Sequence, residues 1–285
     1  MKVSITVLSL LFAVEVASVP TAIFHGLGDA CRHRGMKKFT EKIADDTGDI
    51  AKCVEVGSGM MTSIFENFQV QAEAACSAVL ADPDFQGEFN VLGLSQGGLL
   101  ARYIAQQCPT KVPVRNLATL GGPNRGVAAI PNCGEGGIFC DMIDFIVDNM
   151  VYYDLIQDLV GPAGYYRDPK DLERYLKHCV FLPYHNNEKE FDVSIVDRMT
   201  ALHGALFVMF DADSVVYPRE SEWFHELQED GSVKKMEETE LYLQDMIGLK
   251  TLVEDGRAQF VAFPGEHLQI TNQQIEEIVA PFLAS

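Results

Sequence analysis

A Gly-x-Ser-x-Gly motif at positions 93–97, centred on Ser95, constrains the fold of this chain more than any other feature. The apolar run Phe89–Leu94 before the serine predicts a short buried strand. Apolar residues after it recur with helical spacing, at Leu99, Leu100, Tyr103 and Ile104. A serine on a sharp strand-to-helix turn exposes its hydroxyl group, and the helix N-terminus favours negative charge beside it. We therefore expect a nucleophile elbow at Ser95 rather than an ordinary glycine-rich loop.

Two carboxylates follow a later strand, where the acid of such a site is expected. In an α/β-hydrolase fold the catalytic residues occur in the chain order serine, acid, histidine. The apolar run Leu206–Phe210 predicts a strand, and Asp211 and Asp213 come directly after it. We favour Asp213 because of its spacing. Asp211 is the alternative, although it could equally cap a helix or lie in a solvated loop.

His267 is the predicted general base. It follows the strand candidate Gln259–Phe263 and precedes a helix that begins at Thr271, where Gln274 completes a capping box. The fold class requires its histidine in a loop near the C-terminus, as His267 is. The other histidines are expected to be structural or exposed, and His25 precedes the serine in the chain, contrary to the triad order.

These residue types suit acyl transfer. A serine hydroxyl becomes a good nucleophile when an imidazole takes its proton, and a carboxylate holds that imidazole in the required tautomer. The attacked carbonyl becomes an oxyanion, which fixed N–H groups stabilise. We expect one N–H from Gln96, the residue after the serine, and one from Leu27, in the loop after the first core strand.

Composition narrows the possible partners and cofactors. The 285 residues are 47% hydrophobic and carry a formal net charge of −19, which disfavours nucleic acid and anionic membrane surfaces as partners. The chain has no Cys-x-x-Cys or Cys-x-x-His cluster, so we expect neither a zinc site nor another cofactor. The length suits one α/β-hydrolase domain, predicted over residues 19–285.

Residues 1–18 are typical of a secretory signal peptide. Lys2 gives the basic start, Val3–Val14 is apolar, and small residues at positions 16–18 fit a cleavage site. The apolar run is too short to span a bilayer, and no other segment approaches that length. We expect a mature protein that is soluble in the lumen of the secretory pathway or secreted, and not integral to the membrane. An uncleaved anchor is the alternative.

Seven cysteines in a secreted chain predict disulfides, with one cysteine left over. Cys133 and Cys140 flank a glycine-rich run and could close a small loop. Cys76 lies on an amphipathic helix expected from Met61 to Val79, and Cys108 ends the helix after Ser95. A Cys76–Cys108 bridge is plausible if those two helices pack together. Three cysteines cannot be paired from the sequence: Cys31, Cys53 and Cys179.

The chain closely resembles the palmitoyl-protein thioesterase family, lysosomal α/β-hydrolases that remove fatty acyl groups from cysteine thioesters. The resemblance covers nearly all of the chain after the signal segment. It rests on the segments His25–Cys31, Gly93–Gly98, Asp213–Val216, Ser221–Phe224, Glu238–Tyr242, Gly248–Lys250 and Gly265–Gln269.

The resemblance implies roles for the residues named above. Ser95 would be the nucleophile, Asp213 the acid and His267 the base, with Leu27 and Gln96 as oxyanion donors. The bridges Cys76–Cys108 and Cys133–Cys140 match the family pattern. The family often has paired cysteines where this chain has Cys31-Arg32, so that bridge is expected to be absent.

The resemblance also implies the reaction: hydrolysis of long-chain fatty acyl (palmitoyl) thioesters on S-acylated proteins or peptides. The expected compartment is the lysosome or an equivalent acidic vacuole. Secretion is the alternative, because the chain has no N-glycosylation sequon. A triad alone does not distinguish a thioester from an oxygen ester. A lipase-like esterase or an acyl-CoA thioesterase therefore remains the alternative function, and a binding protein on an inactive hydrolase scaffold is a third.

The segment 125–204 interrupts the core after the strand that ends at Leu120, and it predicts a helical cap. Most of its apolar and tyrosine side chains are expected to bury the cap's own core. By resemblance, some of them would line a groove for the acyl chain. Each buried methylene contributes about 0.8 kcal/mol, so a long chain would gain much of its affinity there.

Overall fold

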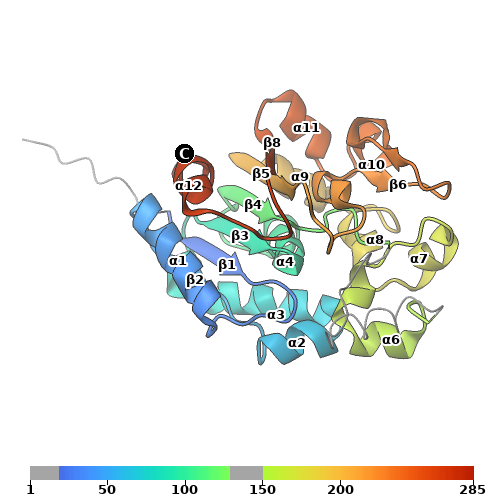
Figure 1. Ribbon diagram of the computed structural model, residues 1–285, viewed down its shortest axis with the longest axis horizontal. Helices are drawn as coiled ribbons and strands as arrows, with labels where there is room; N and C mark the ends of the chain where they lie inside the picture. Colours follow the sequence, from blue (N-terminus) through green and yellow to red (C-terminus); the bar gives the residue numbers. More distant parts are fainter. Residues whose placement is uncertain (1–18, 129–149) are drawn as a thin grey trace, which may run out of the picture.

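The computed structural model describes residues 19–128 and 150–285. Its centre is a 6-stranded parallel sheet with the strand order β2-β1-β3-β4-β5-β8 (Figure 1). The strands are β1 (Thr21–Phe24), β2 (Ala51–Cys53), β3 (Asn90–Leu94), β4 (Asn116–Leu120), β5 (Gly204–Phe210) and β8 (Ala258–Phe263). The strand order reverses between β1 and β3, and loops leaving such a switch point diverge to leave a crevice. The topology therefore predicts a site at the carboxyl ends of β1 and β3.

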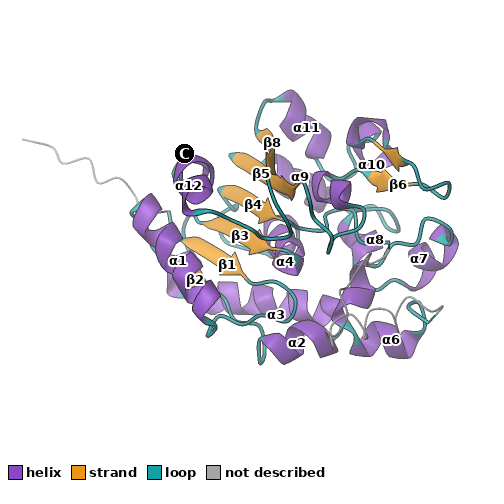
Figure 2. Ribbon diagram, viewed as in Figure 1, coloured by secondary structure: helices purple, strands orange, loops and turns teal. Residues whose placement is uncertain are grey.

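Helices cover both faces of the sheet (Figure 2). On one face, α1 (Arg34–Thr47) packs beside the C-terminal helical segment. This segment comprises α12 (Asn272–Gln274), a π-helical stretch (Ile275–Val279) and α13 (Ala280–Leu283). The other face carries α3 (Phe68–Ala81), α4 (Gln96–Gln106), α9 (Val193–Thr200) and α11 (Leu249–Glu254). The expected α/β-hydrolase architecture, a parallel sheet between helical layers, is confirmed.

Burial on both faces explains why the strands are apolar along their whole length. Every residue of β3 and β4 is buried. Side chains alternate between the faces, so Val91 packs in one core cluster, and Leu92 and Leu94 pack in the other. This burial holds the ends of the strands, and hence the loops that follow them, in fixed positions.

The remaining elements lie mostly at the periphery of the sheet. The helices are α2 (Met60–Phe65), α6 (Asp154–Leu159), α7 (Leu172–His178), α8 (Leu182–His185) and α10 (Glu240–Leu243), and β6 (Glu226–Leu227) pairs with β7 (Val233–Lys234) in an antiparallel hairpin. Among the described residues between β4 and β5, the regular structure is entirely helical. No helix in the described ranges combines the length and apolarity needed to cross a membrane.

One helix boundary differs from the prediction. The helix expected from Met61 to Val79 is divided into α2 and α3. The side chain of Asn67 accepts hydrogen bonds from the backbone N–H groups of Gln69 and Val70, so Asn67 caps a new helix. The apolar spacing continues across this break, which is why periodicity alone did not reveal it.

The described residues contain two disulfides. Cys76 of α3 bonds to Cys108, just after α4, with their Cα atoms 5.5 Å apart. The expectation that no bridge forms at Cys31 is wrong, because Cys31 bonds to Cys53. Strands β1 and β2 are parallel neighbours, so their carboxyl ends meet and bring the two Cα atoms within 5.6 Å. Cys179 is buried and bonds to no other cysteine in ranges 19–128 and 150–285. The predicted Cys133–Cys140 bridge and the signal segment 1–18 lie outside the described residues.

Candidate active site

Ser95 occupies the turn between β3 and α4 with φ 53° and ψ −127°, a backbone conformation that is unusual for a residue other than glycine. A Cβ atom on Gly93 would lie 2.1 Å from the carbonyl oxygen of Gly97, and one on Gly97 would lie 2.3 Å from that of Phe24. Only glycine fits at either position. The motif's glycines therefore allow the close packing that holds Ser95 at the carboxyl edge of the sheet.

Three predicted residues from three loops meet at this edge. The Nε2 atom of His267 lies 2.8 Å from Oγ of Ser95, and its Nδ1 atom lies 2.5 Å from Oδ2 of Asp213. The Asp213 side chain is fully buried. Its Oδ1 atom accepts hydrogen bonds from the backbone N–H groups of Val215 and Val216, at 2.7 and 2.9 Å. An unbroken chain of hydrogen bonds thus joins the carboxylate to the serine.

Asp213 is held in its charged form. Burial opposes the negative charge, but the hydrogen bond from His267, together with other hydrogen-bond donors, outweighs it. The pKa of Asp213 therefore lies below its ordinary value. An ionised Asp213 accepts the Nδ1 proton of His267, and this tautomer leaves the lone pair of Nε2 directed at the Ser95 hydroxyl.

The alternative acid, Asp211, does not reach His267. Its side chain is exposed, and its Oδ1 atom accepts the backbone N–H of Gly265 at 2.9 Å. Asp211 thus ties the loop that carries His267 to the end of β5. On the other side of the imidazole, a Cβ atom on Gly121 would lie 3.0 Å from Cε1 of His267, so a glycine there makes room for the ring.

The loop after β1 brings Leu27 to the same cavity as Ser95 and Gln96. A Cβ atom on Gly26 would lie 3.1 Å from Cβ of Ser95, so this loop passes close to the serine. Within the described ranges, the backbone N–H groups of Leu27 and Gln96 donate to no protein acceptor. Two N–H groups with no partner beside a serine hydroxyl have the chemistry of an oxyanion hole.

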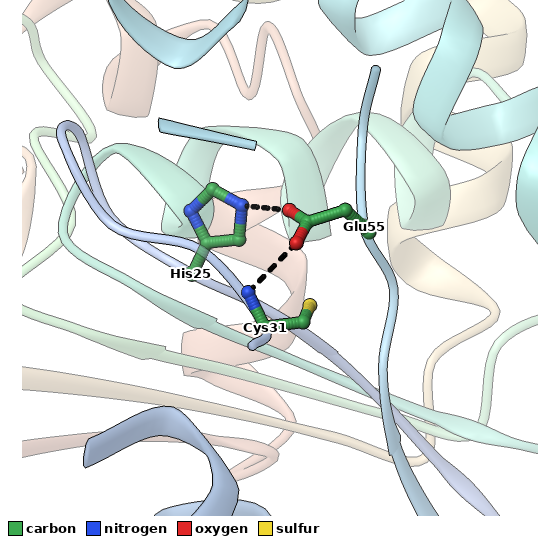
Figure 3. A group of neighbouring side chains, drawn as sticks. All are labelled: His25, Cys31 and Glu55. Atoms are coloured by element: carbon green, nitrogen blue, oxygen red, sulfur yellow. Dashed lines mark hydrogen bonds and ion pairs between the residues drawn. The ribbon is translucent and has the colours of Figure 1, made fainter. Parts of the chain in front are cut away.

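A partly buried network, of which the sequence predicted only the structural role of His25, holds this loop (Figure 3). The His25 ring is almost fully buried, with Nε2 2.7 Å from Oε1 of Glu55 and Nδ1 2.8 Å from the carbonyl oxygen of Gly26. The other Glu55 oxygen accepts the backbone N–H of Cys31 at 2.9 Å. Because the Cys31 sulfur is bonded to Cys53, it cannot act as a thiolate ligand, so the cluster is better explained as a brace for the loop than as a metal site. No sequence pattern identifies Glu55, since its contacts depend on the pairing of β1 with β2.

The Gln96 side chain is also fixed. Its Oε1 atom accepts a 2.8 Å hydrogen bond from the hydroxyl group of Tyr165, and its Nε2 atom donates to the carbonyl oxygen of Ser63 at 3.1 Å. Tyr165 belongs to a 3₁₀ turn (Gly161–Tyr165) in the segment between β4 and β5, and Ser63 lies in α2. The residue after the serine is therefore anchored to two separate helical segments.

A cavity of about 390 Å³ opens beside Ser95 and His267. Outside the loops that carry Leu27, Ser95 and His267, its described lining is largely apolar or aromatic, and includes Val127, Pro162, Tyr165, Tyr166, Val215 and Val216. An apolar cavity beside a few polar groups suits a ligand with a hydrocarbon chain and one reactive head.

Fold and site together are those of a serine hydrolase of the α/β-hydrolase class. A hyperthermophilic esterase from the archaeon Pyrobaculum calidifontis shares the fold, with a TM-score of 0.54 and 14% identity, over 94% of this chain and 76% of that one. Within this class the sequence is more specific: residues 20–267 match the family model described as Palmitoyl protein thioesterase, and the chain belongs to that family.

Two relatives illustrate the match. Palmitoyl-protein thioesterase 1 of Caenorhabditis elegans is 32% identical over 91% of this chain and 89% of its own length. The Drosophila melanogaster protein named lysosomal thioesterase PPT2 homolog is 31% identical over 68% of this chain and 67% of its own length.

Proposed function

We propose that this protein hydrolyses long-chain fatty acyl thioesters, with palmitoyl groups on the cysteines of S-acylated proteins or peptides as its substrates. Ser95 is the nucleophile, His267 the general base and Asp213 the acid that orients the base. One observation supports this assignment above all: the hydrogen-bond chain from Asp213 through His267 to Ser95 ends beside an apolar cavity, in a member of the palmitoyl protein thioesterase family.

The first step forms an acyl-enzyme. Oγ of Ser95 attacks the thioester carbonyl carbon while Nε2 of His267 takes the hydroxyl proton. The tetrahedral intermediate then breaks its C–S bond, and His267 returns the proton to the departing cysteine sulfur. A thiol has a pKa near 8.5, so it leaves with less protonic assistance than an alkoxide. The oxyanion accepts hydrogen bonds from the backbone N–H groups of Leu27 and Gln96.

The second step releases the fatty acid. A water molecule gives a proton to His267 and attacks the acyl-serine carbonyl, and the Ser95 oxygen leaves with that proton. The products are the free acid, the cysteine thiol and the regenerated serine. Both steps use the same base and the same oxyanion donors, so removal of one triad member impairs both.

The acyl chain lies in the apolar cavity. Val215 and Val216 form one part of the wall, and Pro162, Tyr165 and Tyr166 form another. The second group belongs to the proposed cap, residues 125–204, within the single domain proposed over residues 19–285. The cap thus supplies hydrophobic surface for the chain, while the sheet supplies the reacting groups.

We assign the protein to the secretory pathway, with the lysosome or an equivalent acidic vacuole as its destination. The Drosophila relative is named a lysosomal thioesterase. Two disulfides suit an oxidising lumen. Immunolocalisation of the full chain beside lysosomal and secreted markers tests this assignment, and a cytosolic signal would contradict it.

A paired substrate assay tests the reaction. Purified protein and its Ser95→Ala variant are given a palmitoyl-cysteine peptide and the matched palmitoyl-serine oxygen ester. We expect turnover of the thioester that depends on Ser95 and exceeds turnover of the oxygen ester. Equal or faster cleavage of the oxygen ester would indicate a lipase-like esterase instead. No turnover of either, in a folded protein, would indicate a binding protein.

A further inference from the structure

Glu222 is a buried acid for which the triad has no evident use. It lies in the 3₁₀ turn Arg219–Trp223, and its side chain is inaccessible to solvent. Its Oε2 atom accepts the backbone N–H of Phe210 at 3.2 Å. Its Oε1 atom is buried and accepts no hydrogen bond from the described residues, and none of their lysine or arginine side chains pairs with it. A charged carboxylate in this position would lack compensation.

The Glu222 carboxyl group faces Asp213. A carboxylate oxygen of Asp213, a carboxylate oxygen of Glu222 and a ring nitrogen of His267 all lie within 4.8 Å of one another. Two adjacent carboxylates cannot both ionise at low cost in a buried site. Burial, followed by the contact with Asp213, holds the pKa of Glu222 well above its ordinary value, and the charge of Glu220 on the same turn adds to this effect. The pKa of Asp213 is lowered instead, so the proton of the pair resides on Glu222.

We propose that Glu222 keeps its proton at neutral pH and donates a hydrogen bond to the Asp213 carboxylate, as a positioning residue for the triad. A buried O–H has no better acceptor nearby, because the other described contact of this carboxyl group is itself a donor, the N–H of Phe210. The bond limits rotation of Asp213 and withdraws electron density from it. Asp213 thus stays ionised at acidic pH, and it accepts the hydrogen bond from the imidazole less strongly than an unpaired carboxylate would.

The protonation state can be measured without any enzymatic reaction. The folded protein holds a proton that an unfolded glutamate releases above a pKa of about 4.3. This proton by itself therefore makes unfolding more favourable as pH rises, by up to about tenfold in the equilibrium constant per pH unit. Glu222→Gln cannot lose a proton, so the ratio of the wild-type unfolding constant to that of the variant should rise by up to about 100-fold between pH 5 and 7. Glu220→Gln, a partly exposed neighbour, is the matched control and should leave the slope unchanged.

The activity of Glu222 variants then distinguishes a neutral from a charged Glu222. This second test rests on the proposed function. A glutamine amide can still donate to Asp213, so Glu222→Gln should keep kcat/KM within about threefold of the wild type and retain its pH profile. Glu222→Leu removes the donor. It should lower kcat about 10- to 100-fold with little change in KM, and it should move the acid limb to higher pH, because a more basic Asp213 stabilises the imidazolium form of His267.

Distinct results would overturn the proposal. A flat ratio of unfolding constants, or an acid limb that moves to lower pH in Glu222→Gln, would mean that Glu222 is charged in the wild type. Activity abolished by a chelator and restored by a divalent cation would mean that the cluster holds a metal ion instead. If Glu222→Gln does not fold, infrared spectroscopy of the wild type at neutral pH replaces it. The C=O band of a protonated carboxyl group, assigned with isotope-labelled glutamate, must then be present, and its absence would overturn the proposal. Should Ser95→Ala stay active, the proposed triad fails while the stability result still decides the state of Glu222.

Discussion

At the scale of single residues, the site depends on contacts that can be removed one at a time. Ser95 has a strained backbone, His267 has hydrogen bonds at both ring nitrogens, and Asp213 accepts from two backbone N–H groups as well as from His267. Their neighbour Asp211 serves a different purpose, since it supports the Gly265 backbone. This difference allows the acid to be tested against a control two residues away.

Asp213→Asn should lower kcat by about 10³- to 10⁴-fold, because an amide in this position favours the wrong imidazole tautomer. Asp211→Asn should change kcat by less than tenfold. Steady-state hydrolysis of a palmitoyl thioester by both variants checks this, with circular dichroism as the test of folding. Loss of activity in Asp211→Asn but not in Asp213→Asn would mean that Asp211 is the acid.

The glycines of the serine motif give a second prediction at this scale. Gly93→Ala should destabilise the protein by more than about 3 kcal/mol, because its Cβ would overlap backbone atoms of Gly97 that cannot move without displacing α4. Gly87→Ala, where a Cβ would meet nothing within 4 Å, should change stability by less than about 1 kcal/mol. Urea unfolding of both variants measures the difference. Equal midpoints would contradict the packing argument.

Residue reasoning from the sequence named three side chains that lie far apart in the chain but adjacent in the structure, because chemistry and chain order coincide there. Ser95, Asp213 and His267 were named from a motif, two strand ends and the order of the triad, and the structure brings them within hydrogen-bonding distance. Glu55 and Glu222 were not identified as parts of the site. Their roles depend on which side chains and backbone groups lie beside each carboxyl group in the folded chain, and a sequence does not record this.

At the scale of elements, a brace between β1 and β2 fixes the loop after β1, which carries the proposed oxyanion donor Leu27. Glu55 follows β2 and joins His25 to the backbone of Cys31, and the Cys31–Cys53 bond closes the same region. The sequence predicted the loop after β1 but not this brace, because strand order in a parallel sheet is not evident from local periodicity. The bridge at Cys31 was expected to be absent because the family often has paired cysteines where this chain has Cys31-Arg32, and the pairing of β1 with β2 that brings Cys53 close was not evident from the sequence.

Glu55→Ala should lower kcat about tenfold with little change in KM, because the N–H of Leu27 would be less firmly aimed at the oxyanion than at the ground-state carbonyl. Glu55→Gln keeps an oxygen and an amide at the same positions and should retain most of the activity. Michaelis–Menten analysis of both variants separates the two parameters. A change confined to KM would place Glu55 in substrate binding rather than in support of the loop.

At the scale of the whole molecule, the cavity lies between the sheet and the segment that connects β4 to β5. The α/β-hydrolase class followed from the strand and helix patterns around Ser95 and His267, because such patterns are local. The lining of the cavity could not be predicted from the sequence. Its residues Val215, Val216, Tyr165 and Tyr166 come together only when the segment between β4 and β5 packs beside the sheet.

Acyl-chain length tests this arrangement. Each methylene buried in the cavity contributes about 0.8 kcal/mol, so kcat/KM should rise by up to about fourfold for each methylene added. The rise should continue until the cavity is filled and then stop. A series of acyl-cysteine peptides from butyryl to stearoyl measures the slope and the plateau. A flat series would mean that the chain lies outside the cavity.

Covalent labelling of the serine tests the central claim most directly. The protein is titrated with a fluorophosphonate, the labelled residue is mapped by peptide mass spectrometry, and palmitoyl thioesterase activity is followed in the same samples. We predict a single modified residue, Ser95, with activity that falls in proportion to the label. Full labelling of Ser95 with undiminished turnover, or loss of turnover with the label on another residue, would contradict the account.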